Sequence, residues 1–385
     1  MENTDFIPFS KPSFSEEEEK AVLSVMRSGW ITTAKEALEF EKEFAKKINA
    51  RHCLCVNSNT SGLQLAMEAC GIKEGRKILT TPYTFISTAT SAIHLGGDVV
   101  YADIEKDSYS IDPEEIEKKL KEDKTIKAIL PVHIAGNPCN MRAIRELAKK
   151  YGVYIIEDCA HSLPSLTDDG YCGTLGDIGV FSFYATKTMT TAEGGMISTN
   201  NDELAKRMSL MRMHGIDRSV WDRYTSSKAS WEYDVIDAGF KFNLPDILAA
   251  IGRVQLKKVD LFYEKRLSIV KRYNEAFKNC DFIELPPSQK GNAWHLYMIR
   301  INSEVCGISR NDFSLQLQKK GIGVSMHFIP HFYFTYWKKR GLNEKDFPNA
   351  KNMYEKSLSL PLWPDMTDSM VNRVIEAVLE TGKGK

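Results

Sequence analysis

Residues 181–199 read FSFYATKTMTTAEGGMIST, and this run contains a single lysine, Lys187. Aromatic residues lead into the lysine, and two glycines and an apolar run follow it. A surface lysine needs no such setting, whereas burial lowers the pKa of an ammonium and favours the neutral amine. A neutral amine can form a Schiff base with an aldehyde. The stretch therefore predicts a loop between two buried strands that presents Lys187 as a reactive amine.

Around this stretch, short apolar runs alternate with helical patterns. Such alternation is typical of βαβ units, and it predicts an α/β fold with a mostly parallel sheet covered by helices on both faces. Ligands of such sheets bind at the carboxyl ends of the strands. The strand candidates are CLCV (53–56), KILTT (77–81), DVVYADI (98–104), IKAILPVHI (126–134), VYIIEDCA (153–160), GVFSFY (179–184) and GGMIST (194–199).

The pattern changes from Pro245 onward. Residues 245–278 read as one long helix or two helices in tandem, and the last hundred residues mix strands and helices in α+β style. We place a domain boundary within the long helix, which predicts a large domain of residues 1–255 and a small domain of residues 256–385. Near the start of the chain, Ser15 is a candidate helix N-cap and Gly29 a candidate helix stop.

Composition excludes several classes of function. Lys plus Arg equals Asp plus Glu at 51 each, which argues against nucleic-acid binding through bulk charge. The opening MENTDFIPFS lacks the basic and apolar regions of a signal peptide, and no apolar stretch reaches membrane-spanning length. The eight cysteines lack the paired CxxC spacing of zinc sites. We therefore expect a cytoplasmic protein with no nucleic-acid or membrane partner.

The strand VYIIED ends in two acids, Glu157 and Asp158. A carboxylate at the end of a buried strand is poorly solvated, so it either caps the next helix or pairs with a cationic ligand group. An acid for the pyridinium nitrogen and a lysine for the imine are the two protein groups that a pyridoxal phosphate (PLP) site requires. Asp158 and Lys187 fit these roles. His161 follows on the same side of a turn, although a lone histidine is more often structural.

Phosphate binding needs a separate group of donors. VNSNTSGLQLAMEA (56–69) runs from a strand through a small polar turn into a helix, where Thr60, Ser61 and backbone N–H groups favour an anion. An ordinary N-cap is the alternative interpretation. Ser182 stands five residues before the lysine and can also reach a phosphate. Phe85 follows another strand and is a candidate to stack on the pyridine ring, although a lone Phe there is usually core.

Together these motifs resemble the DegT/DnrJ/EryC1/StrS sugar aminotransferases, a branch of the fold type I PLP enzymes. Within the family they are most similar to the UDP-4-amino-4-deoxy-L-arabinose aminotransferase branch. The resemblance implies a large domain with a mostly parallel seven-stranded sheet and a smaller α+β C-terminal domain. It covers nearly the whole chain and includes SGWITTAKEALEFEKEFA, VNSNTSGLQLA, TPYTFISTATSAIHLGGDVVYADI, IIEDCAHS, FSFYATKTMTTAEGGMIST, GFKFNLPDILAAIGRVQL, WHLYMIRI and GIGVSMHFIPH.

The resemblance also implies roles for individual residues. Lys187 would bind PLP covalently, Asp158 would contact the pyridine nitrogen, His161 would lie beside the cofactor and Phe85 would stack on its ring. The phosphate would be held by Thr60, Ser61 and Ser182. The chain departs from the family at Asn59, where relatives usually have Gly or Ala, and this position lies where the substrate could be sensed.

Family members are homodimers with active sites at the subunit interface. The GFKFNL loop (239–244) would reach the phosphate of the neighbouring subunit, through either Lys241 or Asn243. His327 and His331 are four residues apart like helical metal ligands, but Pro330 intervenes, and we expect no metal. Residues expected near the substrate are Trp30, Thr32, Thr33, His327 and His331.

The implied reaction moves the amino group of L-glutamate to a nucleotide-linked 4-keto sugar and leaves 2-oxoglutarate. The sugar would be a UDP-linked 4-ketopentose or a 4-keto-6-deoxyhexose, used for a surface glycan or lipopolysaccharide. One alternative is a PLP-dependent sugar dehydratase, but known dehydratases of this fold carry histidine in place of Lys187. The other is a non-catalytic homologue with a regulatory role.

Overall fold

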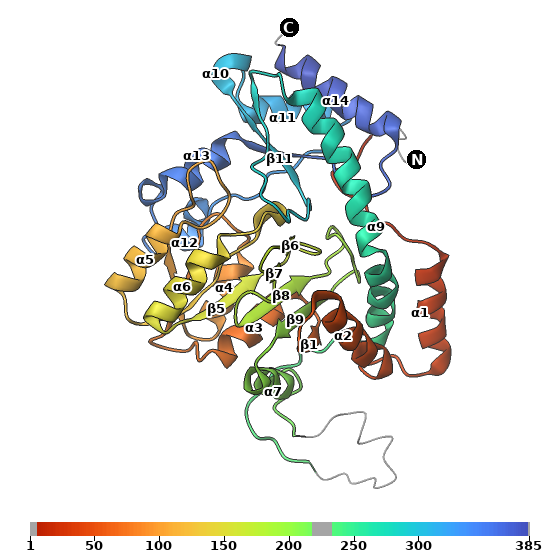
Figure 1. Cartoon of the computed structure of the whole chain (residues 1–385), viewed down its shortest axis with the longest axis vertical. Helices are drawn as coiled ribbons and strands as arrows, with labels where there is room; N and C mark the ends of the chain where they lie inside the picture. The colour runs from red at the N-terminus through yellow and green to blue at the C-terminus, as the bar shows by residue number, and fades with distance from the viewer. Residues whose placement is uncertain (1–5, 218–232, 384–385) are drawn as a thin grey trace.

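The computed structural model describes residues 6–217 and 233–383 and has the predicted α/β architecture (Figure 1). A mostly parallel seven-stranded sheet lies at its centre, so this part of the prediction is confirmed. In spatial order the strands are β1 (His52–Val56), β9 (Gly195–Thr199), β8 (Ile178–Ser182), β5 (Tyr154–Asp158), β4 (Ile126–Ile129), β2 (Lys77–Thr80) and β3 (Asp98–Tyr101).

Strand β9 runs against its neighbours. It pairs antiparallel with both β1 and β8, whereas β8, β5, β4, β2 and β3 pair in parallel. Strands β8 and β9 therefore form a hairpin, and its connecting loop carries Lys187. Because β5 and β8 are parallel neighbours, their carboxyl ends meet at the same edge of the sheet.

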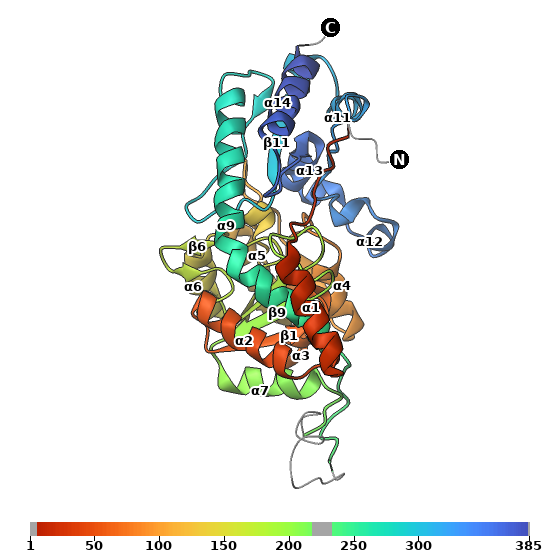
Figure 2. The ribbon, with the colours of Figure 1, turned by 90° about the vertical axis from the view of Figure 1, so that its right-hand side faces the viewer.

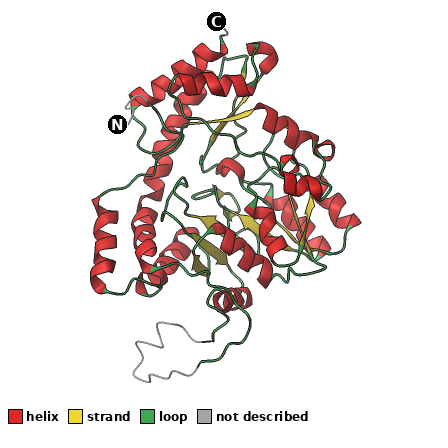
Figure 3. Ribbon diagram, turned by 180° about the vertical axis from the view of Figure 1, so that it is seen from behind, coloured by secondary structure: helices red, strands yellow, loops and turns green. Residues whose placement is uncertain are grey.

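Helices cover both faces of the sheet (Figure 3). Alternate residues of β8 point to opposite faces, with Val180 in one buried cluster and Phe181 in the other. Both clusters are continuous cores, which explains why the strands read as unbroken apolar runs. On the Val180 side lie α3 (Asn59–Ala69), α4 (Ser87–His94) and α7 (Asp202–Met211), and on the Phe181 side lie α2 (Lys35–Ile48), α5 (Pro113–Glu122), α6 (Met141–Tyr151) and α9 (Asp246–Phe277).

Two glycines allow α3 to pack unusually close to the sheet. A Cβ atom on Gly62 would lie 2.5 Å from Val180 Cγ1, and a Cβ atom on Gly195 would lie 2.8 Å from the carbonyl carbon of Ser58. Real Cβ atoms essentially never come this close to another heavy atom. The N-terminus of α3 is therefore held directly over the ends of β8 and β9.

The C-terminal part of the chain builds a second, antiparallel sheet of β10 (Ile283–Glu284), β11 (Tyr297–Ile301) and β12 (Ser357–Leu360). Helix α9 is one continuous helix that runs from the central sheet to this smaller one (Figure 2). The domain boundary near residue 255 stays a prediction, because the helix crosses it without a break. The α-helices of this C-terminal part are α10 (Ser303–Cys306), α11 (Arg310–Lys319), α12 (Thr335–Lys339), α13 (Pro348–Lys356) and α14 (Asp368–Gly382). Earlier in the chain, β6 (Leu166–Thr167) and β7 (Gly170–Tyr171) form a separate two-stranded sheet.

The ends of α1 (Glu16–Ser28) confirm the sequence signals. Ser15 forms a capping box with Glu18, and Gly29 ends the helix with a φ of 74°. Within the described ranges, no helix combines the length and the apolar composition needed to cross a membrane.

The N-terminus of α2 is capped from a distant part of the chain. Its own N-cap, Ala34, has no side-chain acceptor. The buried carboxylate of Asp246, at the start of α9, instead accepts hydrogen bonds from the backbone N–H groups of Ala34 (2.7 Å), Glu36 (3.1 Å) and Ala37 (3.1 Å). This carboxylate joins two helices and also benefits from the positive end of the α2 dipole.

Replacing Asp246 with Ala should destabilise the protein by about 2–4 kcal/mol, because three N–H groups lose a charged acceptor. The matched control is Asp260→Ala, which removes an exposed ion pair (Lys47 Nζ to Asp260 carboxylate, 2.6 Å) between the same helices. That change should cost about 0–0.5 kcal/mol. Urea unfolding followed by circular dichroism measures both, and equal midpoints for the two variants would contradict this account of α2.

Candidate active site

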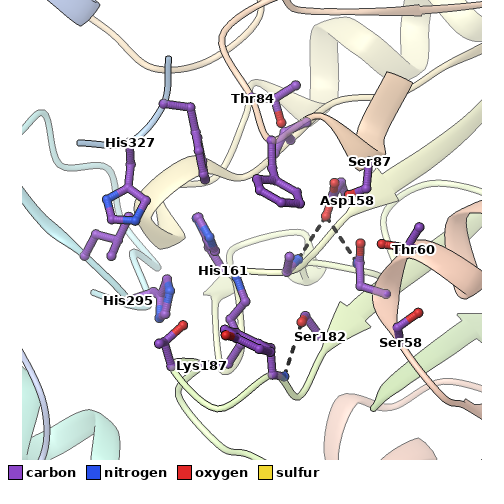
Figure 4. Close-up of a pocket in the computed structure, with 18 of the residues that line it drawn as sticks. Ser58, Thr60, Thr84, Ser87, Asp158, His161, Ser182, Lys187, His295 and His327 are labelled. Atoms are coloured by element: carbon purple, nitrogen blue, oxygen red, sulfur yellow. Dashed lines mark hydrogen bonds between the residues drawn. The ribbon is translucent and has the colours of Figure 1, made fainter. Parts of the chain in front are cut away.

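A cavity of about 490 Å³ lies at the carboxyl ends of the central strands (Figure 4). Asp158 ends β5, Ser182 ends β8, and both line the cavity together with residues from the N-terminus of α3. The structure thus brings together residues that are far apart in the sequence. The predicted site residues in its wall are Thr60, Phe85, Asp158, His161, Ser182, Lys187 and His327.

The loop that carries Lys187 is tied back on itself. The backbone N–H of Phe183 donates to the Gly194 carbonyl (2.9 Å), and the N–H of Thr191 donates to the Phe183 carbonyl (3.0 Å). The N–H of Lys187 donates to the Tyr184 carbonyl (2.9 Å). These bonds close the hairpin loop around the lysine and direct its side chain into the cavity (Figure 4).

The Lys187 amine is easier to deprotonate in the cavity than in water. Burial lowers the pKa of Lys187 to about 8, while the Asp158 carboxylate acts in the opposite direction. Burial also raises the pKa of Asp158, and Lys187 is one of the groups that oppose this shift. The two groups therefore interact within one cavity, as the sequence predicted for an imine lysine and a ring-nitrogen acid.

The carboxylate of Asp158 is held by three donors. Its Oδ1 accepts from the Ala160 backbone N–H (3.1 Å) and from Asn59 Nδ2 (3.4 Å), and its Oδ2 accepts from Thr88 Oγ1 (3.0 Å). The sequence analysis missed the role of Thr88, which lies one helical turn after Phe85. Asn59, expected where the substrate could be sensed, lines the cavity, and its side chain is also buried against Asp158.

His161 is neutral in this setting. Its Nδ1 accepts a hydrogen bond from the Ala135 backbone N–H (3.2 Å), and its ring stacks on Phe328 with centroids 5.5 Å apart. Burial lowers the pKa of His161 well below its usual range, and the nearby Lys187 ammonium lowers it further. His161 therefore offers the cavity an uncharged ring with its proton on Nε2.

The candidate phosphate site is formed by the N-terminus of α3. Ser58 is the N-cap of this helix, and Ser58 and Thr60 line the cavity beside Ser182. Ser61 differs from the expectation: its hydroxyl donates to Asn57 Oδ1 (2.5 Å) and also pairs with Ser58 Oγ (2.8 Å). Ser61 therefore supports the turn and does not line the cavity.

Two further predicted segments lie together, and their predicted site residues do not line the cavity of their own chain. Asn243 Nδ2 donates to Thr33 Oγ1 (2.5 Å), and Lys241 Nζ donates to Asn243 Oδ1. Thr33 Oγ1 in turn donates to the Leu244 carbonyl (2.5 Å). The GWITT and GFKFNL segments therefore form one hydrogen-bonded unit, and Trp30, Thr32, Thr33, Lys241 and Asn243 are all absent from the cavity wall.

The two histidines of HFIPH have different surroundings. His327 lines the cavity, and its Nδ1 pairs with Ser359 Oγ (2.8 Å). His331 is fully buried, with Nδ1 bonded to Tyr101 Oη (2.8 Å) and its ring stacked on Trp337. The structure therefore gives His331 a core position rather than the expected place near the substrate.

His295 is a further residue of the cavity wall. It comes from the segment before β11, and its ring lies 4.4 Å from that of His161, centroid to centroid. Burial lowers the pKa of His295 well below its usual range. Three neutral imidazoles, of His161, His295 and His327, thus form the wall opposite the phosphate site (Figure 4).

Glu157 does not line the cavity and belongs to a separate buried cluster of polar side chains. Among the described residues, His133, Glu157 and Cys159 form the one group with metal-ligand atoms close together. However, the Glu157 carboxylate already accepts four hydrogen bonds, from His133 Nε2 (3.0 Å) and from the backbone N–H groups of Gly173 (2.9 Å), Leu175 (2.8 Å) and Gly176 (2.7 Å). Its acceptor positions are filled, so this acid stabilises the loop that follows β5.

The comparisons with known proteins agree with this geometry. The sequence profile of the DegT/DnrJ/EryC1/StrS aminotransferase family matches residues 12–379. The chain belongs to this family. It is 40% identical to the spore coat polysaccharide biosynthesis protein SpsC of Bacillus subtilis over 383 residues, which is 98% of each sequence.

Solved structures show the same fold. Spr1654 of Streptococcus pneumoniae, classed as a sugar aminotransferase and solved in PLP and PMP forms, superposes with a TM-score of 0.91 at 28% identity, over 98% of this chain and 99% of the other. Helicobacter pylori PseC, an aminotransferase involved in pseudoaminic acid biosynthesis, gives 0.89 at 29% identity, over 99% and 100%. The protein is a PLP-dependent sugar aminotransferase with the fold of the type I PLP enzymes.

The residues of the cavity fit PLP. Lys187 and Asp158 supply the amine and the acid, Ser58, Thr60 and Ser182 supply hydroxyls, and Phe85 keeps 56% of its surface exposed although it lines a cavity. An exposed aromatic face beside buried polar groups is suited to a flat heteroaromatic ring. When bound, PLP supplies an aldehyde that accepts amino groups and a protonated ring that withdraws electrons.

The lowered pKa of Lys187 predicts the pH dependence of PLP capture by the cofactor-free protein. At pH 7 a pKa of about 8 leaves about one amine in ten neutral, against about one in three thousand at the ordinary 10.5. Because the neutral amine is the nucleophile, the capture rate should rise with pH and level off above pH 8. Stopped-flow absorbance measures this rate, and borohydride reduction with peptide mapping locates the modified lysine. An inflection near pH 10, or a label on another lysine, would contradict the assignment.

Proposed function

We propose that this enzyme transfers the amino group of L-glutamate to a nucleotide-linked 4-keto sugar and releases 2-oxoglutarate. The observation that carries the proposal is the placement of Lys187 and Asp158 in one cavity, where each shifts the pKa of the other. Membership of a sugar aminotransferase family supports the sugar acceptor. A UDP-linked 4-ketopentose or a 4-keto-6-deoxyhexose is the acceptor that we propose, for surface glycan or lipopolysaccharide synthesis.

Lys187 would carry the proton transfers in both half-reactions. With PLP bound, the neutral Nζ would take the proton from Cα of glutamate and pass it on to the cofactor. In the second half-reaction Nζ delivers a proton to the sugar carbon that receives the amine. A positioned general base of this kind contributes about 10²–10⁴ in rate, and a pKa near 8 is well matched to neutral pH.

Asp158 and the imidazoles would set the electrostatics of the site. The Asp158 carboxylate keeps the ring nitrogen protonated, and a hydrogen bond of this charged kind is worth about 1.5–3 kcal/mol. Burial lowers the pKa values of His161, His295 and His327, so these imidazoles are neutral and leave Asp158 as the charged partner of Lys187. They also supply hydrogen-bonding groups on the side of the cavity where a sugar would enter.

The active site would be completed by a second subunit in a homodimer. Lys241 is exposed, and its ammonium group contacts Asn243 Oδ1 and the sulfur of Met213 (4.0 Å). The amide of Asn243 is occupied on both sides by Thr33 and Lys241. We therefore propose that Lys241 contacts the phosphate in the neighbouring subunit and that Asn243 holds Lys241 in place. In that arrangement Trp30 and Thr32 of the attached GWITT segment would lie near the neighbouring substrate.

We also propose a cytoplasmic location, where nucleotide sugars are made. All eight cysteines are unpaired, and seven of them are buried. Unpaired thiols are typical of a reducing compartment.

Substitution of Lys187 should abolish the reaction. Lys187→Ala removes the amine, and Lys187→Arg leaves a group that stays cationic, so both should lose the visible absorbance of lysine-bound PLP and at least about 10³-fold in transamination. Mass spectrometry with glutamate and a panel of nucleotide keto sugars measures the wild type and both variants. Retained absorbance in Lys187→Ala would move the site elsewhere, and a wild type that aminates none of the keto sugars would refute the proposed acceptor.

Complementation between two defective variants tests the shared site. Lys187→Ala and Lys241→Glu should each be nearly inactive, but a mixed dimer has one site with both changes and one with neither. Co-expression in equal amounts should restore about one quarter of wild-type activity if the two-fold dimer exchanges loops. Activity no higher than that of the parents would show that Lys241 serves its own chain. Asn243→Ala, which removes only the support of Lys241, should lose less activity than Lys241→Glu.

A further inference from the structure

Asn59 joins three elements of the site through one buried side chain. It is the first residue of α3, and only 8% of its surface is exposed. Its Nδ2 donates to the Val180 carbonyl of β8 (2.9 Å) and lies 3.4 Å from Asp158 Oδ1 at the end of β5. The side chain therefore points toward the sheet and does not cap its own helix.

The acceptor positions of Asp158 show which oxygen is free for a ligand. An ionised carboxylate has about four acceptor positions, two on each oxygen. Oδ1 already faces the Ala160 N–H and Asn59 Nδ2, whereas Oδ2 faces only Thr88 Oγ1. The open position is therefore on Oδ2, and rotation of the carboxylate is limited by donors on both of its oxygens.

Asn59 also stands between two residues of the candidate phosphate site. Ser58 and Thr60 flank it in the sequence, and both line the cavity. The side chain of Asn59 therefore links the backbone of the candidate phosphate site directly to the Asp158 carboxylate, and this link sets the distance between the two. The Val180 carbonyl would keep a hydrogen-bond donor without Asn59, because it also accepts from the Cys159 N–H (2.8 Å).

We propose that Asn59 is a positioning residue that fixes Asp158 so that Oδ2 meets the ring nitrogen of PLP while the phosphate lies at the start of α3. The inference rests on the proposed role of Asp158 as the partner of that nitrogen. In this arrangement Asn59 would act on the ring nitrogen through Asp158. Its effect should therefore appear only with a ligand that carries a ring nitrogen.

The test compares the binding of PLP with that of 1-deaza-PLP, in which carbon replaces the ring nitrogen. Isothermal titration calorimetry on the cofactor-free full-length protein gives both dissociation constants. In Asn59→Ala, we expect the constant for PLP to rise about tenfold and that for 1-deaza-PLP to change less than twofold, because only the ring nitrogen depends on a well-placed carboxylate. The matched control is Ser182→Ala, on the phosphate side, which should weaken both ligands by the same factor.

The possible outcomes distinguish a failure of the inference about Asn59 from a failure of the proposed role of Asp158. If the wild type binds PLP and 1-deaza-PLP equally, Asp158 does not bind the ring nitrogen and the proposed role fails. If the wild type prefers PLP but Asn59→Ala weakens both ligands equally or neither, the inference about Asn59 is wrong. Should Asn59→Ala not fold, as judged by circular dichroism, Asn59→Leu carries the test, because it has a similar shape, adds no charge beside Asp158, removes the donor and should show the same selective loss.

Discussion

The arrangement of this protein depends on one pair of buried groups, the amine of Lys187 and the carboxylate of Asp158. Each group is costly to bury alone, and each reduces that cost for the other. Burial nevertheless lowers the pKa of the lysine to about 8, so the pair supplies an amine that is easily deprotonated beside an acid whose raised pKa is held down by its hydrogen bonds and by Lys187. A PLP-dependent transamination needs both groups at the same time.

The fold brings these two groups together through the order of its strands. Parallel pairing of β5 and β8 puts Asp158 and the start of the lysine loop at one edge, and the reversal at β9 turns that loop into a closed hairpin. Because α3 packs closely against the sheet at Gly62 and Gly195, its N-terminus lies at the same edge. The positions that we propose for the imine, the ring nitrogen and the phosphate thus follow from the packing of a few neighbouring elements.

The sequence predicted most of this architecture, because alternating apolar runs and helix signals are local properties. It also identified Lys187 and Asp158, since a strand end is visible in the sequence and places its residues at the binding edge. Positions that depend on distant contacts could not be predicted. Asn59 turns toward Asp158, Ser61 bonds within its own turn, His331 packs against Trp337, and Asp246 caps a helix that begins 211 residues earlier (246 − 35).

The most direct test of the central pair is a crystal structure of the protein with PLP. We predict that Lys187 Nζ is bonded to the former aldehyde carbon of PLP and that an Asp158 carboxylate oxygen lies about 2.7–2.9 Å from the ring nitrogen. A ring bound elsewhere, or a ring nitrogen that faces a residue other than Asp158, would contradict the account.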